Sequence, residues 1–506
     1  MFRGKAVKWL EWLWLFGVLL LYMGCSTKIP TLEESAKSTH IPTKFNNAVL
    51  NNASATGEQQ KPLSNAQEKD SHIEQFMKLI DDTLLHNILH IALEKNTNVL
   101  TMISRIKQAQ SQMKINTASM LPTINGGLNS SYIDNRTLSQ STIVRPGANS
   151  INASVSMSWE LDLFGKLYAL RQSSKKAYLQ AQSNLSYAQI TLMAEVATLY
   201  FTLRDNAHSL SIAKATLANL EQIEEINADK LKLGLIDIST YQGFVANTTN
   251  AKNTYESLQY TFEQNKNALL VLLNIPLEEL NQKVDFLDYS TWDFPHIAPF
   301  YVDKMPSDVL LSRPDVQASM YAYHAQLYRQ TNANAARLPN ISLSGSIGQV
   351  LYSSTQANSI VYQIANSITA PLLNRTSLKQ NYLIQKELSN EAFYTLQNNI
   401  NTALGEIENA LFDVDSKKRQ LENTQNVYEV GAKAYETNSA RNTQGLLDKN
   451  DFLGLENTYF NLKTQLFNAK TNEILSVITL FKAFGGNLGL NTSLQGSNNE
   501  SLSNPQ

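Results

Sequence analysis

The sequence predicts a mixed α+β membrane protein in which four β-strands and two pairs of very long antiparallel helices form two copies of one unit. Three observations predict this fold: a long internal repeat, segments in which apolar and polar residues alternate, and segments with an apolar residue at every third or fourth position. The first observation sets the number of copies, and the other two assign strands and helices within each copy.

The composition excludes several classes of protein. The chain has 506 residues, with 42 Lys and Arg against 44 Asp and Glu, so its formal net charge of -2 argues against a nucleic-acid binder. A single cysteine, Cys25, excludes a disulfide framework and any cysteine-rich metal site. With 43% hydrophobic residues the chain is expected to fold, although only 17% of its residues are charged.

The N-terminus is typical of an export signal. Basic residues precede an uncharged run, Trp12 to Met23, that is too short to span a membrane but suits a signal peptide over 1–24. The small residue before Cys25 resembles a bacterial lipoprotein box, which predicts lipidation of Cys25. The alternative is an ordinary signal peptide in which this cysteine is incidental. The polar residues 25–74 that follow predict an extended arm.

An internal repeat organises the rest of the chain. The segment around Pro122 recurs around Pro339, and the turn Gly-Leu-Ile-Asp at Gly234 recurs as Gly-Leu-Leu-Asp at Gly445. Several matches in the same order at nearly constant offset indicate a duplicated unit. We therefore expect four segments after the arm: a first repeat over 75–273, a linker region over 274–312, a second repeat over 313–486 and a polar, disordered tail over 487–506.

Each copy begins with a helix and a strand hairpin. Helices are expected at 97–118 and 314–336, ending near Leu-Pro pairs because proline cannot continue a helix. After Pro122, residues 155–163 alternate apolar side chains with Ser, Glu and Asp, the period of a strand. The expected strands are 123–134, 152–163, 340–351 and 361–372. The expected junctions between helices and strands are Pro122, Gly165, Pro339 and Pro371.

Each copy ends with a pair of long helices. From Leu185 to Leu220, apolar residues recur every 3.5 positions on average, the repeat of coiled coils. A helix over 177–233 would be about 85 Å long at 1.5 Å per residue. The expected pairs are 177–233 with 239–273, turning at Gly234, and 388–443 with 449–484, turning at Gly445.

The strands suit a membrane barrel with an apolar outer face and a wet lumen. The alternative is a small soluble sheet packed on a core. Because four strands cannot close a barrel and open edges are not tolerated in lipid, a barrel requires several subunits. Two subunits would supply eight strands and three would supply twelve, and the residues do not choose between these numbers.

Together these features resemble the TolC/OprM-type outer-membrane factors. The resemblance covers residues 75–487 and includes Trp159–Lys166 (WELDLFGK), Arg313–Val316 (RPDV) and Ala483–Gly486 (AFGG). It implies a homotrimer whose 12-stranded β-barrel continues into a long antiparallel α-helical barrel across the periplasm. It further implies a lipid-anchored outer-membrane exit duct of a tripartite efflux pump, with a periplasmic adaptor and an inner-membrane pump as partners.

The resemblance also implies a gate at the periplasmic tip, near the turns at Gly234 and Gly445. Asp451 falls where such proteins carry a gate aspartate, and Asp448 and Asp237 are further candidates by proximity. In a trimer each would form a ring of three carboxylates, which attracts cations. The alternative for any of them is helix capping or solvation.

No catalytic or metal-binding motif is evident. His86 and His90 share a helical face with Glu94, but the glutamate of a metalloprotease motif is missing, and surface histidines are the preferred interpretation. We expect no enzyme, no metal and no cofactor. Two alternatives to the efflux duct stay open: a type I secretion channel for polypeptides, and a lipid-anchored coiled-coil scaffold without a pore.

Overall fold

The computed structural model describes residues 72–133, 148–283, 294–298, 306–353, 359–371 and 373–488. Their contacts divide them into two compact units. The strand unit comprises residues 104–182 and 318–398, and the helical unit comprises the remaining described residues. The predicted signal peptide and Cys25 lie outside the described residues.

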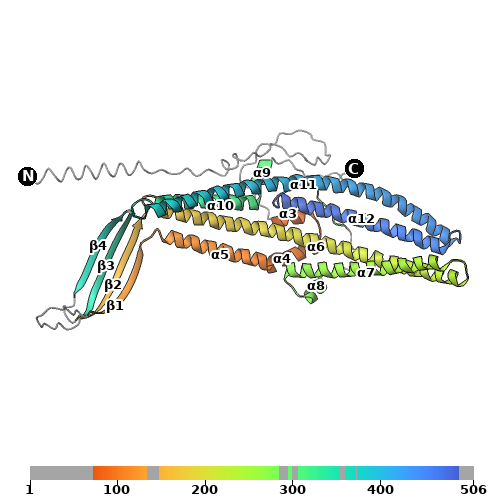
Figure 1. The fold of residues 1–506 in the computed structure, drawn as a ribbon, viewed down its shortest axis with the longest axis horizontal. Coiled ribbons are helices and arrows are strands. Elements are labelled where there is room, and N and C mark those ends of the chain that lie inside the picture. The colour runs from red at the N-terminus through yellow and green to blue at the C-terminus, as the bar shows by residue number, and fades with distance from the viewer. Residues whose placement is uncertain are drawn as a thin grey trace, which may run out of the picture. The chain divides into compact units, whose positions relative to one another are not determined.

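The strand unit contains one antiparallel sheet in the order β1-β2-β3-β4 (Figure 1). Its strands are β1 Thr123–Ile133, β2 Ala148–Leu161, β3 Asn340–Ser353 and β4 Ile360–Thr369. All four predicted strands are confirmed, although β2 begins four residues earlier than expected and β4 ends three earlier. β1 and β4 are the edges, and within the described chain neither has a partner on its outer side.

The register gives the sheet one apolar and one polar face. Directly paired residues share a face, and Val155 pairs with Gly126 on one side and Ile347 on the other. The same face carries the following apolar side chains: Ile124, Leu128, Tyr132, Met157, Trp159, Ile341, Leu343, Tyr362, Ile364 and Ile368. Serine, asparagine and glutamine dominate the other face. Much of the apolar face is exposed, with Ile364 83% accessible.

The predicted junction residues lie where the elements change. Pro122 directly precedes β1, Pro339 directly precedes β3, and Pro371 follows the end of β4 by two residues. Gly165 stands one residue before a long helix and has a φ of 72°. At each junction the chain switches between strand and helix, as the sequence predicts.

The expected helices are present, but the first long helix of each pair starts earlier than predicted. α5 Thr97–Ala118 and α10 Pro314–Ala335 precede the hairpins. The long pairs are α6 Lys166–Lys232 with α7 Ile238–Leu273, and α11 Arg375–Thr443 with α12 Lys449–Ala483.

The predicted starts at 177 and 388 were therefore wrong. In the first copy, Asp162 accepts the backbone N–H of Leu167 at 3.1 Å and of Tyr168 at 2.6 Å, which stabilises the start of α6. In the second copy, α11 begins directly after Asn374. The early turns of α6 bury small residues such as Ala169, Ser173 and Ser174, and the early turns of α11 are mostly exposed, so neither has the regular apolar stripe on which the predicted helix starts were based.

Shorter helices cover the middle of the helical unit. α3 His72–Leu79 contacts α12, and α4 Thr83–Lys95 contacts α7. The other short helices of the described chain are α8 Leu277–Lys283 and α9 Pro306–Ser312. Phe76 of α3 makes an edge-on contact with Phe481 of α12, with ring centroids 5.0 Å apart. Asp82 caps α4 and accepts the Tyr200 hydroxyl at 3.0 Å. Among the described helices, none combines the length and the apolar character needed to cross a membrane.

A buried arginine joins the start of the second repeat to two long helices. Arg313 is 2% exposed, and its guanidinium lies 2.7 Å from Asp315 and 2.7 Å from Glu406 of α11. It also donates to the Ala483 carbonyl at the end of α12, at 2.7 Å. Pairing with carboxylates raises the pKa of Arg313 although burial opposes it. This cluster holds α10, α11 and α12 in one arrangement.

Candidate functional site at the helix turns

The α6–α7 and α11–α12 turns are two copies of one structure. Gly234 and Gly445 both have a φ of 72°, a conformation that side chains with a Cβ rarely adopt. In each turn the next N–H reaches back five residues to a helix carbonyl, from Leu235 to Lys230 and from Leu446 to Arg441, both at 2.8 Å. This is the Schellman pattern for ending a helix. The predicted equivalence of the two turns is confirmed.

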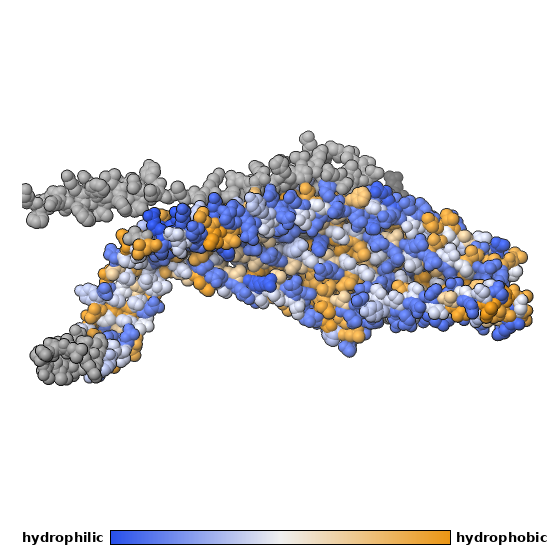
Figure 2. Space-filling view, in the orientation of Figure 1, coloured by the Kyte–Doolittle hydropathy of each residue, from blue (hydrophilic) through white to orange (hydrophobic). Residues whose placement is uncertain are grey.

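The two turns expose apolar side chains. Figure 2 shows hydrophobic residues gathered at the end of the helical unit where the turns lie. Those that are more than half exposed are Leu233, Leu235, Ile238 and Leu446. Exposed apolar groups on a turn that caps two helices are typical of a contact surface.

The three candidate aspartates have different surroundings. Asp237 caps α7, accepting the Thr240 N–H at 2.8 Å, and these bonds lower its pKa. Asp448 holds the equivalent position before α12, but its side chain makes no capping bond and lies 3.9 Å from Lys230. Asp451 is exposed in the first turn of α12. Capping therefore explains Asp237, whereas the carboxylates of Asp448 and Asp451 have no such structural role.

Polar contacts join α6 to α12 beside these turns. The buried Asn227 donates to Asn450 at 2.9 Å, one residue before Asp451. Further along, the buried Asn219 donates to Glu456 at 2.9 Å and to Asn457 at 3.0 Å. These contacts connect the two helix pairs within one chain. The sequence analysis missed them, although asparagines within an apolar stripe eight residues apart could have indicated them.

Tyrosines line the α11–α12 pair above the second turn. Tyr435 stacks on Tyr459, with centroids 4.3 Å apart and planes at 8°, and its hydroxyl donates to Glu456 at 2.9 Å. The hydroxyls of Tyr428 and Tyr459 lie 3.1 Å apart. Glu456 thus accepts hydrogen bonds from α11 and from α6 simultaneously, so it is one of the residues at which the two helix pairs meet.

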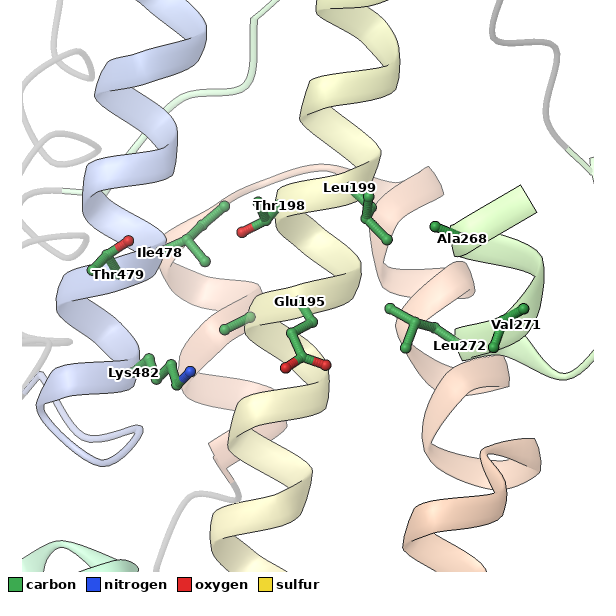
Figure 3. A pocket seen from close by; sticks show the side chains of 10 residues that line it. Glu195, Thr198, Leu199, Ala268, Val271, Leu272, Ile478, Thr479 and Lys482 are labelled. Atoms are coloured by element: carbon green, nitrogen blue, oxygen red, sulfur yellow. The ribbon is translucent and has the colours of Figure 1, made fainter. Parts of the chain in front are cut away.

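A groove of about 620 Å³ lies between α6, α7 and α12 (Figure 3). Its walls are mostly apolar, with Leu199, Val271 and Ile478 among the lining residues, and it contains one carboxylate, Glu195, and one ammonium, Lys482. The groove has the size of a small-molecule site. Two threonines, Thr198 and Thr479, also line it, so the groove offers a mostly apolar space with a few polar groups to a solute.

The histidines considered as metal ligands have other surroundings. The ring of His86 lies 2.9 Å from the Ile80 carbonyl, and His90 is exposed. Among the described residues, no group of three or more His, Cys, Asp or Glu side chains could hold a metal ion.

Residues 88–274 and 305–486 match the family described as outer membrane efflux protein. The chain belongs to this family. Each matched segment contains one strand hairpin and one pair of long helices, so the family assignment agrees with the two repeats read from the sequence. Its members are transport proteins, as expected for a chain without a catalytic motif.

Named relatives and a solved structure agree with this assignment. The chain is 24% identical over 415 residues to the toluene efflux pump outer membrane protein TtgF of Pseudomonas putida, covering 80% of this chain and 84% of the relative. It is 22% identical over 422 residues to the outer membrane protein OprJ of Pseudomonas aeruginosa, covering 81% and 86%. The CmeC outer membrane channel of Campylobacter jejuni has the same fold, with a TM-score of 0.72 at 23% identity, covering 86% of this chain and 94% of CmeC.

Proposed function

We propose that this outer membrane efflux protein is a homotrimer that forms the exit duct of a tripartite pump. Three sheets would close a 12-stranded barrel, and the long helices would form the tunnel below it. A periplasmic adaptor would bind the exposed turns, and an inner-membrane pump would supply the energy. The observation that carries this proposal is a four-stranded sheet with an exposed apolar face and two open edges.

The open edges argue for assembly. An unpaired strand edge in lipid leaves backbone N–H and C=O groups without hydrogen-bond partners, which costs several kcal/mol of free energy for each group. Pairing β4 of one subunit with β1 of the next would satisfy both edges and close the ring. The polar face, rich in Ser, Asn and Gln, would then line a wet lumen.

The low charge of this lumen face supports passive conduction with little selectivity. Glu160 is the charged residue on the polar face of β2, and it forms an ion pair with Lys166. Choice of solute would then belong to the pump, in agreement with a duct that serves as the common exit.

The gate is proposed at the second turn. Three copies of Asp448 and of Asp451 would form two carboxylate rings, since neither side chain is used for capping in this chain. Rings of like charge attract cations and repel one another. Asp237 is excluded from this role in our proposal because its carboxylate already caps α7.

Cys25 is proposed as the site of a lipid anchor on the periplasmic side. Several acyl chains hold a protein firmly to a membrane, whereas a single chain gives marginal attachment. Intact-mass measurement of the mature protein tests this: a mature chain that begins at an acylated Cys25 supports the anchor, and an unmodified Cys25 contradicts it.

Single-channel conductance in a planar bilayer tests the duct and its gate together. The wild type should conduct poorly, and the Asp448→Ala/Asp451→Ala variant should conduct several-fold better because the carboxylate rings are gone. Asp237→Asn is the matched control: it removes one charge from the first turn but keeps an oxygen that can cap α7. It should behave as the wild type.

Each other outcome changes the proposal in a defined way. High conductance in all proteins would keep the duct and reject the gate assignment. No conductance from correctly assembled protein would favour a scaffold without a pore. A stable monomer in detergent, found by mass measurement, would contradict the barrel itself.

A further inference from the structure

Three basic side chains line one hollow in the strand unit. The hollow has a volume of about 360 Å³ and lies between the end of α10 and the start of α11. Arg337, Arg375 and Lys379 contribute its charge, and the other lining residues are Asn334, Leu338, Thr376 and Leu378. The lining contains no carboxylate, so three positive charges share one concave surface without compensation from it.

One of the three cations is held in place. The Arg337 guanidinium donates to the Asn334 side-chain oxygen at 3.1 Å and lies over the Tyr382 ring, 5.4 Å from its centroid. A stacked and hydrogen-bonded guanidinium loses less freedom when it binds an anion, and its planar donors suit phosphate. Arg337 is therefore oriented before any ligand arrives.

The other two cations repel each other. Arg375 and Lys379 are four residues apart on α11, both are exposed, and neither makes an ion pair or side-chain hydrogen bond within the described chain. Like charges at this spacing destabilise a helix by a few tenths of a kcal/mol. An anion in the hollow would remove this repulsion and contact Arg337 as well.

The hollow lies where the apolar face of the sheet ends. Arg337 stands three residues before β3, and Arg375 stands six residues after β4. Leu373, two residues before Arg375, is fully exposed, and Ile368, one residue before the end of β4, is 74% exposed. Figure 2 shows hydrophilic and hydrophobic residues side by side around the start of α11. In a protein that spans a bilayer, basic side chains near exposed apolar groups are expected at the level of the phospholipid headgroups, where the lipid-facing surface ends.

We propose that this hollow binds the phosphate of an anionic phospholipid, such as phosphatidylglycerol, at the periplasmic surface of the membrane. The inference rests on the proposed function, because the lipid is available only if the sheet lies in a bilayer. Such a contact would fix the depth of the barrel in the membrane at the point where strands give way to helices.

Native mass spectrometry of the full-length assembly, titrated in detergent with phosphatidylglycerol or phosphatidylcholine, tests the proposal. The wild type should retain phosphatidylglycerol in preference to phosphatidylcholine. The Arg375→Gln/Lys379→Gln variant should bind phosphatidylglycerol about 25-fold more weakly, at roughly fivefold for each cation removed. The matched control is Lys433→Gln/Arg441→Gln, which removes two exposed cations from the same helix outside the hollow and should bind as the wild type.

Three results would overturn the proposal. Equal retention of phosphatidylglycerol by the variant and its control would show that the hollow is not the site. Equal retention of phosphatidylglycerol and phosphatidylcholine by the wild type would show that the negative charge of the lipid does not determine binding. Loss of the lipid on addition of millimolar inorganic phosphate, with phosphate retained instead, would make this a site for free anions. Oligomer mass and conductance of the same samples separate these results from a failure of the duct proposal.

Discussion

The Glu456 carboxylate of α12 accepts a hydrogen bond from the Asn219 amide of α6, with 2.9 Å between Oε2 and Nδ2. Its other oxygen accepts the Tyr435 hydroxyl of α11, also at 2.9 Å. One side chain therefore connects three long helices and both helix pairs. Because Glu456 bonds to both pairs near their turns, it should limit how far α6–α7 and α11–α12 can separate there.

Replacing Glu456 with alanine should loosen the second helix pair. Hydrogen bonds to a charged acceptor contribute about 1.5–3 kcal/mol each, and removal of Glu456 leaves the amide of the buried Asn219 with Asn457 as its acceptor on α12. Amide hydrogen exchange over 428–460 should speed up several-fold, and single-channel conductance should rise.

The matched control for Glu456 is Glu436→Ala, which removes an exposed carboxylate from α11 that makes no hydrogen bond to α6 within the described part of the chain. Its exchange should remain at the wild-type rate. Equal acceleration in the two variants would mean that the net charge of this region, and not the contact with Asn219, holds the helices together.

Two glycines of α11 should respond in opposite ways to alanine. A Cβ on Gly431 would collide with Leu462 of α12, whereas a Cβ on Gly405 would meet only open space. Gly405→Ala should therefore stabilise the fold by about 0.5–1 kcal/mol through helix propensity. Gly431→Ala should lose about 1–3 kcal/mol because Leu462 must move. Urea denaturation followed by circular dichroism measures both, and a stabilised Gly431→Ala would show that α11 and α12 are not closely packed there.

The Arg313 cluster should be among the most sensitive points of the fold. Arg313→Gln removes the buried cation that donates to the partly exposed Asp315 and Glu406, which should cost about 1.5–3 kcal/mol. Arg419→Gln is the comparison, because Arg419 and Asp415 form an exposed pair one turn apart whose loss should cost below about 0.5 kcal/mol. Similar losses in the two variants, measured by urea denaturation, would contradict the structural importance of burial at Arg313.

Local patterns predicted most of the fold, and long-range contacts account for what they missed. Gly234 and Gly445 marked the turns because the αL conformation that ends each helix requires a residue without Cβ. The start of α6 was misplaced because it depends on a cap from Asp162, which precedes the apolar stripe.

The periodicity of the sequence did not predict which residues of the long helices contact one another near the candidate site. Asn219 and Glu456 are 237 residues apart, and nothing in either helix indicates that the two face each other. The same is true of Arg313 and Glu406, although the Arg-Pro-Asp motif singled out the first. Asp448 and Asp237 occupy equivalent positions in sequence, and only their side-chain contacts distinguish the cap from the candidate gate residue.

Protonation of His208 should destabilise the helical unit as the pH falls. This imidazole stacks on Phe467, with centroids 4.0 Å apart and planes at 9°. Burial, helped by the nearby Lys463, lowers its pKa from 6.5 to about 4. Because the folded-state pKa lies below the unfolded value, the stabilisation is complete above pH 6.5 and is lost as the pH falls towards 4. His208→Phe keeps the stacking and removes the titration, so the difference in unfolding free energy between variant and wild type should grow in favour of the variant across this window.

The control for His208 is His90→Gln, at an exposed histidine, whose difference from the wild type should stay flat with pH. The difference in unfolding free energy between variant and wild type is used because a second group titrates in the same pH range. Burial raises the pKa of Asp205 on the same helix to about 6, so Asp205 makes the protein more stable as the pH falls, equally in wild type and variant. Urea midpoints between pH 4 and pH 7 provide the measurement. A pH-independent difference for His208→Phe would mean that this histidine accepts a proton without cost and that the α6–α12 contact around it is open to water.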